Sequence, residues 1–350
     1  MKKKTAGLVI AGAVVIALAA FFGSKALQYR FGTAVTRDGI LLVSTEDSYA
    51  QLLDSLASSH IDSATRAGFL SNEKAFERQA AARKLAESFK PGRYELKNGM
   101  TYSALINTLR SGRQAPVRVT FNNIRTMDRL AGAVSKRLEF DSLSILKALT
   151  DKSVIESYGY TPQTFMAMFI PNTYEFYWNT TPSGFLDRMQ KESDRFWTSV
   201  SRDSLRARSG LSREQVMTLA SIVYEETKMK SEMPRVAGVY INRLRRGMLL
   251  QADPTVKFAL GDFEIRRVLL RHLEADSPYN TYKYAGLPPG PICMPSIDAI
   301  DAVLNYEDND YLYFCAKADL SGAHAFAKTL AEHNRNAQTY SHALNRMGIR

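Results

Sequence analysis

Leu219–Thr227 (LASIVYEET) is the segment from which the rest of this chain is best interpreted. Its composition is typical of a helix, and Ser212 with Gln215 three residues later forms a capping-box pattern at the helix start. At about 100° per residue, one face of this helix is apolar. The residues of that face are Val216, Leu219, Ala220, Val223 and Thr227.

Two glutamates near the end of this segment are predicted to lie on different faces of the helix. Glu226 falls at the edge of the apolar stripe, whereas Glu225 falls almost opposite, on the predicted solvent side. A carboxylate at the rim of a buried face is partly desolvated, which raises its pKa. Such a glutamate can hold a proton near neutral pH and donate it as a general acid. The same pattern also fits two ordinary acidic residues, one of them half-buried and paired with an arginine.

The N-terminus has the features of a membrane anchor. Lys2–Lys4 precede Ala6–Gly23, a run without charged residues that as a helix spans about 27 Å, close to the thickness of a bilayer core. The positive-inside rule leaves the basic head in the cytoplasm. A cleaved signal peptide is the alternative, but the apolar run is long and Ala20–Ser24 (AFFGS) is a poor cleavage site. We therefore predict a single-pass protein of the cytoplasmic (inner) membrane, with most of the chain in the periplasm or extracytoplasmic space.

Charge and cysteine content narrow the classes of ligand. The net charge is +11, with basic runs at Arg243–Arg246 and Arg266–Arg271. An exported domain does not meet nucleic acid, so we expect an anionic polymer or the membrane surface as the partner. The five histidines are scattered, so we predict no metal and no cofactor. Cys293 and Cys315 form no disulfide framework, and whether they pair stays open.

The region beyond the anchor, about 325 residues long, is large enough for two domains of mixed helix and strand. In its first part we expect a strand pair within 31–48, helices over 48–59 and 73–88, and a strand–helix–strand unit at 85–122. A mainly helical stretch follows at 123–208. Beyond it we expect a helix from Met233 to Gly247, a short helix after 251–255, a strand at 310–316 and a helix from 329. Residues 169–178 are turn-rich and aromatic, which suits either sugar stacking or core packing.

The C-terminal half resembles the catalytic domain of the MltG (YceG-like) family of membrane-anchored endolytic murein transglycosylases. The matching motifs are Ala220–Val223 with Glu226, Asn242–Leu244, Gly247–Met248, Leu250–Gln251, Asp253–Val256, Tyr279–Tyr282, Gly286–Ile292, Tyr311–Phe314, and His324 with Phe326. Residues 90–121 are similar to the LysM-like subdomain of that family. Asn172 stands where many relatives have Asp, and residues 259–277 follow the family pattern only loosely.

The resemblance implies a lyase that cleaves the β-1,4 bond between N-acetylmuramic acid (MurNAc) and N-acetylglucosamine (GlcNAc) in peptidoglycan without water. Glu226 would protonate the glycosidic oxygen and then take the proton of the muramic 6-hydroxyl, which closes a 1,6-anhydro ring. The intramolecular nucleophile explains why one carboxylate suffices. The resemblance also implies action on nascent glycan strands and peptidoglycan synthases as partners.

The other matched residues receive roles from their chemistry. Amide groups hold acetamido and hydroxyl groups, and tyrosines stack on sugar rings. The predicted substrate-binding residues are Asn242, Gln251, Asp253, Tyr279, Asn280, Tyr282, Tyr313 and His324. Asp253 is also interpreted as a helix N-cap, and Arg243 as the partner in a structural ion pair.

The chain is therefore predicted to be an α+β protein in five parts: a cytoplasmic head (1–5), a transmembrane anchor (6–24), an extracytoplasmic region with the LysM-like subdomain (25–122), a helical connecting region (123–208) and a catalytic domain (209–350). Two alternatives remain open. One is a hydrolytic muramidase in which Asp253 or Glu232 activates water. The other is a non-catalytic scaffold that binds peptidoglycan. Cut position, product length and oligomeric state are not predicted.

Overall fold

The computed structural model describes residues 16, 19–21, 23–24, 32–57, 68–199 and 202–346. The predicted head lies outside these residues, and so does most of the predicted anchor. Among the residues that are described, no helix has both the length and the apolar character needed to span a membrane.

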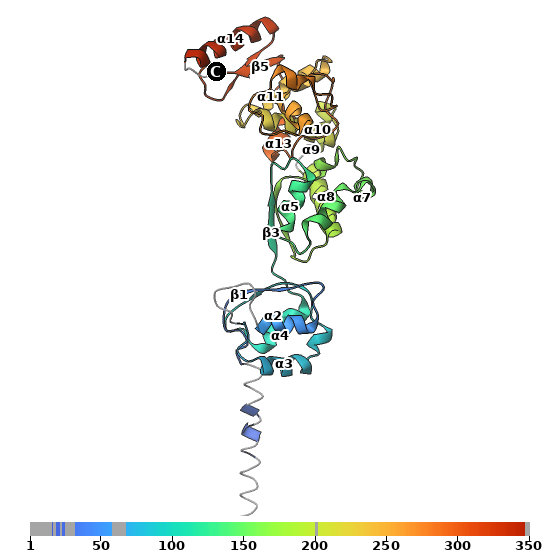
Figure 1. The fold of residues 1–350 in the computed structure, drawn as a ribbon, viewed down its shortest axis with the longest axis vertical. Coiled ribbons are helices and arrows are strands. Elements are labelled where there is room, and N and C mark those ends of the chain that lie inside the picture. The colour runs from blue at the N-terminus through green and yellow to red at the C-terminus, as the bar shows by residue number, and fades with distance from the viewer. Residues whose placement is uncertain are drawn as a thin grey trace, which may run out of the picture. The chain divides into compact units, whose positions relative to one another are not determined.

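The described residues form many helices and a smaller number of short strands, so the predicted mixture of helix and strand is confirmed (Figure 1). The strands are β1 (Gly39–Val43), β2 (Gly92–Leu96), β3 (Val117–Phe121), β4 (Asn172–Phe176), β5 (Tyr313–Ala316) and β6 (His324–Ala327). The helices are α2 (Tyr49–Ala57), α3 (Glu73–Ala82), α4 (Tyr102–Ser111), α5 (Met127–Ser135), α6 (Ser142–Thr150), α7 (Lys152–Ser157), α8 (Pro182–Thr198), α9 (Arg202–Ser209), α10 (Arg213–Glu226), α11 (Met233–Arg245), α12 (Asp253–Leu260), α13 (Ile297–Leu304) and α14 (Leu330–Arg346). Short 3₁₀ turns cover Leu85–Glu87, Phe165–Met168 and Leu270–Glu274.

The first of two compact units contains the described residues up to 118, together with 137–139 and 175–180. Its sheet pairs β1 with β2 in antiparallel register, with Gly39 opposite Leu96 and Val43 opposite Gly92. The predicted strand pair within 31–48 is therefore wrong, because the partner of β1 is β2. An apolar run indicates that a segment is a strand, but the strand it pairs with depends on packing. The core of this unit includes Leu41, Leu52, Phe76, Tyr94 and Leu105, all buried.

The second unit contains 119–136, 140–174 and the described residues from 181 onward. The predicted connecting region and catalytic domain therefore share one unit, apart from 137–139 and 175–180. In the aromatic stretch 169–178, β4 replaces the expected turn and pairs with β3. Phe169, Ile170 and Tyr174 are buried, as the core-packing interpretation requires, whereas Tyr177 is 58% exposed.

Helix α10 is at the centre of the core of the second unit. The predicted capping box is present, since the Ser212 hydroxyl accepts from the Gln215 backbone N–H at 3.2 Å and the Gln215 side chain accepts from the Ser212 N–H at 2.9 Å. Helices α11, α12 and α13 pack against α10. The buried Ser221 hydroxyl accepts from the Ile292 backbone N–H at 3.0 Å, which holds the proline-rich loop 286–292 against this helix.

The remaining predicted elements of the second unit are present with shifted ends. Helix α11 begins at Met233 with Pro234 in its first turn, and Gly247, with φ of 67°, follows its end. Strands β5 and β6 form an antiparallel hairpin that packs beside α14, both drawn in red shades in Figure 1. Cys293 and Cys315 are both free thiols and do not form a disulfide with each other.

Candidate active site

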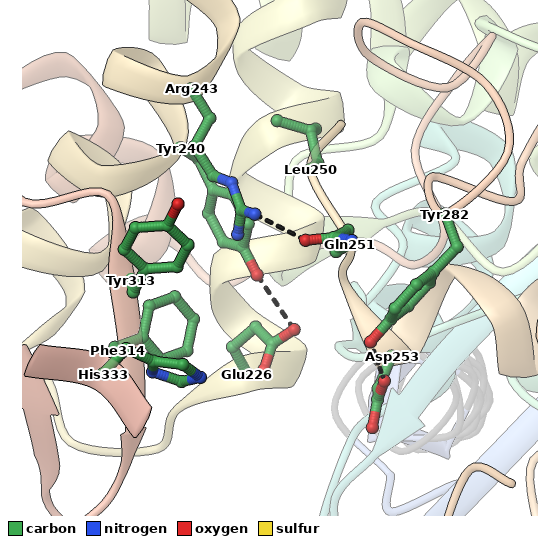
Figure 2. A pocket seen from close by; sticks show the side chains of 10 residues that line it. All are labelled: Glu226, Tyr240, Arg243, Leu250, Gln251, Asp253, Tyr282, Tyr313, Phe314 and His333. Atoms are coloured by element: carbon green, nitrogen blue, oxygen red, sulfur yellow. Dashed lines mark hydrogen bonds between the residues drawn. The ribbon is translucent and has the colours of Figure 1, made fainter. Parts of the chain in front are cut away.

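A pocket with a volume of about 280 Å³ opens beside the end of α10 (Figure 2). Helices α10, α11, α12 and α14, strand β5 and the loops before α12 and after the 3₁₀ turn at 270–274 contribute its walls. The lining residues are Glu226, Tyr240, Arg243, Leu250, Gln251, Asp253, Tyr282, Tyr313, Phe314 and His333. Five of the residues predicted from the sequence are therefore brought together: Glu226, Gln251, Asp253, Tyr282 and Tyr313.

Glu226 is the last residue of α10, and its partly buried carboxyl group faces the pocket. Its Oε1 accepts a hydrogen bond of 2.9 Å from the Tyr240 hydroxyl. Desolvation raises the pKa of Glu226 to about 7, although the bond from Tyr240 acts in the opposite direction. The neighbouring charge of Asp253 raises this pKa further. A carboxyl group with a pKa near neutrality is suited both to donating and to accepting a proton.

Tyr240 is the direct partner of Glu226 and was not among the residues predicted for the site. It is buried on α11, and its ring meets that of Phe314 edge-on at a centroid distance of 5.8 Å. Burial, followed by the charge of Glu226, raises the pKa of Tyr240 well above its usual value. The phenol therefore stays protonated and remains a hydrogen-bond donor to Glu226. No periodicity in the sequence identifies this partner, because it comes from a different helix.

Glu225 has surroundings that differ from the prediction. Its side chain is only 15% exposed, and its Oε2 accepts from Arg125 Nη2 at 2.7 Å. The predicted solvent-facing position is therefore wrong. The reason is tertiary: Arg125, 100 positions earlier in the chain, covers this side of α10. The half-buried, arginine-paired glutamate that the sequence left open exists, but it is Glu225 and not Glu226.

Arg243 lines the pocket and does not form the predicted ion pair. The residue is 8% exposed, and among the described residues its guanidinium has no carboxylate partner. Its Nη2 donates to Gln251 Oε1 at 2.6 Å, and its guanidinium carbon lies 5.4 Å from the centre of the Tyr313 ring. Burial lowers the pKa of Arg243. Gln251 has a φ of 53°, a left-handed backbone conformation that few residues other than glycine and asparagine favour.

Asp253 and Tyr282 form the wall opposite Tyr313 in Figure 2. The Tyr282 hydroxyl donates to Asp253 Oδ1 at 2.6 Å. Asp253 is the first residue of α12, and Ala252 occupies the N-cap position, so the predicted capping role of Asp253 is wrong. The turn begins one residue earlier than expected because the Thr255 hydroxyl bonds to the Ala252 carbonyl at 2.7 Å.

Asn242 and Asn280 are predicted ligands of sugar groups, but neither lines the pocket. The Asn242 amide donates to the backbone carbonyls of Asn309 at 2.7 Å and Tyr311 at 3.0 Å. Asn280 is fully buried, and its amide donates at 2.8 Å to two carbonyls of the preceding loop. Both side chains therefore hold loops in place, and the NH₂ groups of both amides already donate within the protein.

Tyr279 and His324 also lie outside the pocket lining. The Tyr279 ring packs on Phe258 at a centroid distance of 4.7 Å. His324 Nδ1 lies 2.9 Å from the carboxylate of Glu232, which is 9% exposed and also accepts from the His324 backbone N–H at 3.0 Å. The His324 ring meets Phe314 edge-on at 5.3 Å. His324 thus supports a wall of the pocket from behind.

Phe314, Leu250 and His333 complete the lining and were not predicted as site residues. His333 comes from α14 and stacks on Tyr313 at a centroid distance of 5.5 Å. Phe314 lies in a motif that the family resemblance includes, but the sequence offered no argument for its contact with Tyr240. Within the part of the chain that the structure describes, no group of three or more His, Cys, Asp or Glu residues is arranged to hold a metal ion.

Comparison with known proteins is consistent with this geometry. A sequence model of the YceG-like family matches residues 41–339. An endolytic murein transglycosylase of Bacillus subtilis is 31% identical over 292 residues, which cover 79% of this chain and 79% of the relative. One of Streptococcus pneumoniae is 32% identical over 47% of this chain and 30% of the relative. The crystal structure of a yceG-like protein from Listeria monocytogenes has a TM-score of 0.55 and 26% identity, covering 85% of this chain and 98% of that one.

Proposed function

The chain belongs to the YceG-like family, and on that premise we propose that it is an endolytic murein transglycosylase with Glu226 as its catalytic residue. The enzyme class follows from the relatives, which are named endolytic murein transglycosylases. The observation that supports the residue assignment is the carboxyl group of Glu226, which faces the pocket with a pKa of about 7 and is bonded to Tyr240.

The first chemical step uses protonated Glu226 as an acid. It transfers its proton to the oxygen that joins MurNAc to GlcNAc, and the bond between that oxygen and C1 of the muramic sugar breaks. GlcNAc leaves with a 4-hydroxyl group, and positive charge develops at C1. The carboxylate formed on Glu226 then lies beside this charge, which stabilises the oxocarbenium-like state.

The second step uses the same residue as a base. Glu226 takes the proton of the muramic 6-hydroxyl, and the oxygen forms a bond to C1, which closes a 1,6-anhydro ring. Glu226 regains the proton that it lost, and no water is consumed. Since the nucleophile is part of the substrate, ring closure benefits from proximity, and no second carboxylate is needed to activate it.

Tyr240 positions the carboxyl group for both steps. Its hydroxyl donates to Oε1, which leaves Oε2 as the oxygen that carries the transferable proton. The same bond favours the ionised form after the first step, whereas desolvation favours the protonated form before it. The two effects oppose each other, and the resulting pKa of Glu226 is close to neutral pH.

Hydrolysis remains a second candidate because one other carboxylate faces the pocket. Asp253 lines it and accepts from Tyr282, so a water molecule held between Asp253 and the sugar could act as the nucleophile. The structure does not support Glu232 in that role, since its carboxylate is engaged by His324 and does not line the pocket.

The finer parts of the proposal concern place and partners. We propose that residues 6–24 anchor the chain in the cytoplasmic membrane and that the remainder acts in the periplasm or extracytoplasmic space on nascent strands, beside peptidoglycan synthases. The basic head and the uncharged run support the anchor. The LysM-like subdomain at about 85–122 and its affinity for glycan belong to the same proposal, supported by the sequence motifs alone.

The test is digestion of purified peptidoglycan by the full-length protein in detergent, in water enriched with ¹⁸O, followed by mass spectrometry of the products. The wild type should release fragments with 1,6-anhydro ends and without ¹⁸O, and Glu226→Gln should release almost none. Asp253→Asn serves as the matched carboxylate control. Reducing ends that contain ¹⁸O, with activity lost in Asp253→Asn, would establish hydrolysis instead. No release by the wild type would favour a non-catalytic scaffold.

A further inference from the structure

Arg243 is a buried cation that has no carboxylate partner among the residues that the structure describes. It is 8% exposed, and its Nε has no hydrogen-bond partner among the described residues. A buried charge is ordinarily paired, because removal from water is unfavourable for an isolated ion. In this pocket the guanidinium bonds instead to the neutral amide of Gln251 and lies over the ring of Tyr313. The unpaired charge therefore points to a ligand.

Gln251 is arranged to assist such a ligand. A guanidinium only donates hydrogen bonds, so the amide oxygen of Gln251 is the atom that faces Arg243, and its NH₂ group is left to donate elsewhere. The residue is exposed and keeps a φ of 53°, which is unfavourable for a glutamine. Its backbone N–H is tied to the Thr281 carbonyl at 3.1 Å, which maintains that conformation.

Arg243 lines the same pocket as Glu226. Tyr240 and Arg243 are three residues apart on α11 and therefore neighbours on one face of the helix. Tyr240 bonds to Glu226, and Figure 2 shows the guanidinium and the Glu226 carboxyl group on the same side of the pocket. A sugar that reacts at Glu226 thus places its ring substituents beside Arg243.

We propose that Arg243 and the amide NH₂ of Gln251 form a subsite that binds a carboxylate carried by the muramic residue at the cleavage point. Muramic acid carries a lactyl carboxyl group, which is either free or joined by an amide bond to a stem peptide with carboxylates of its own. Both sources present the same group to a guanidinium, which binds it through charge-assisted hydrogen bonds. This inference rests on the proposed function and specifies the substrate of that same pocket.

The test measures binding to full-length Glu226→Gln protein in detergent by calorimetry, with three tetrasaccharides made of alternating GlcNAc and MurNAc. One carries free lactyl carboxylates, the second carries lactyl methylamides, and the third carries a dipeptide stem with free carboxylates. A carboxylate form should bind about 10- to 100-fold more tightly than the methylamide form. Preference for the first form identifies the lactyl group as the source, and preference for the third identifies the stem.

Variants then connect the preference to this residue. Arg243→Met should reduce the preference for a carboxylate to less than about threefold. Arg243→Lys keeps the charge but loses the paired N–H donors of the guanidinium group, and it should retain part of the preference. Arg246→Met is the matched control at the residue directly after the same helix, exposed and outside the pocket lining, and should leave the preference unchanged. The comparison of ligands on the parent protein needs no Arg243 variant, so it holds even if Arg243→Met folds poorly.

Equal affinity for all three tetrasaccharides, or a preference that persists in Arg243→Met, would overturn the subsite. Failure of the proposed function has a different signature: the Glu226→Gln protein would cleave the tetrasaccharides, or the wild type would not, whatever the affinities are.

Discussion

Glu225 and Glu226 are adjacent in the chain and both are partly buried, but their hydrogen-bond partners differ. Glu225 is joined to the cation of Arg125 at 2.7 Å, whereas Glu226 is joined to the neutral hydroxyl of Tyr240 at 2.9 Å. An opposite charge favours an ionised carboxylate, whereas a hydroxyl compensates only part of the cost of burying one. The two glutamates therefore differ in partner and in place, since Glu226 lines the pocket and Glu225 does not.

The largest expected effect is on turnover. Glu226→Gln removes the only proposed proton carrier and should lower the rate of glycan cleavage by about 10²- to 10⁴-fold. Glu225→Gln should change that rate by less than about tenfold, because its carboxylate contacts Arg125 and not the pocket. The measurement is release of soluble fragments from purified peptidoglycan. Similar losses in both variants would mean that the two glutamates act as one unit.

The pH dependence of stability should distinguish the same two residues. The pKa of Glu226 is raised from 4.5 to about 7, so between these values the folded protein binds more protons than the unfolded chain. The free energy of unfolding should therefore fall as pH rises from about 4.5 through about 7. Glu226→Gln should lack this loss and should gain on the order of 3 kcal/mol relative to wild type at pH 8 compared with pH 4.

Denaturant titrations of both proteins across pH 4–8 measure this difference. Glu225→Gln is the matched control, because it makes the same change at the adjacent glutamate, which does not line the pocket. A difference between wild type and Glu226→Gln that stays constant with pH would show that Glu226 does not titrate in this range.

Removing the cation of Arg125 tests the ion pair of Glu225. Arg125→Met leaves the largely buried Glu225 carboxylate with only the exposed ammonium group of Lys228, 3.9 Å away, and should lower the free energy of unfolding by on the order of 2 kcal/mol. The effect is below that of a fully buried pair because the Arg125 side chain is 30% exposed. Adding Glu225→Gln to Arg125→Met should restore part of the loss in thermal unfolding. An additive loss in the double variant would argue against the pair.

The smallest expected effect concerns the hydrogen bond from Tyr240. Tyr240→Phe keeps the ring but removes the donor that lowers the pKa of Glu226, so this pKa should rise above about 7. The alkaline limb of kcat/KM for a soluble glycan should move upward by about one pH unit or less. Tyr313→Phe is the matched control, since it lines the pocket without bonding to Glu226. Equal profiles for both variants would remove Tyr240 from the proposed mechanism.

Much of the local structure followed from residues close in sequence. The capping box at Ser212, the proline in the first turn of α11 and the glycine after its end are all where the sequence indicated. Such signals act over a few residues and need no distant partner. The apolar stripe of α10 also identified Glu226 as a rim residue, and the structure places it in the pocket.

The predictions that failed depended on distant contacts. The partner of β1, the strand at β4 and the covered position of Glu225 each require a segment that lies far away along the chain. The same holds for the amides of Asn242 and Asn280, whose chemistry suited sugars but whose hydrogen bonds go to backbone carbonyls. Residue type alone does not say whether a polar group is already satisfied.

From the sequence alone came the family of the protein and the choice of Glu226 as its candidate acid, because a helical period and a set of ordered motifs are properties of the chain itself. The folded chain was needed to place Tyr240 against Glu226 and Arg243 against Gln251. These pairs join different elements, and their distances depend on how α10, α11 and the loop before α12 pack around a shared core. The burial of a charged group and the choice of its partner are properties of that packing, and they place Glu226 and not Glu225 in the pocket.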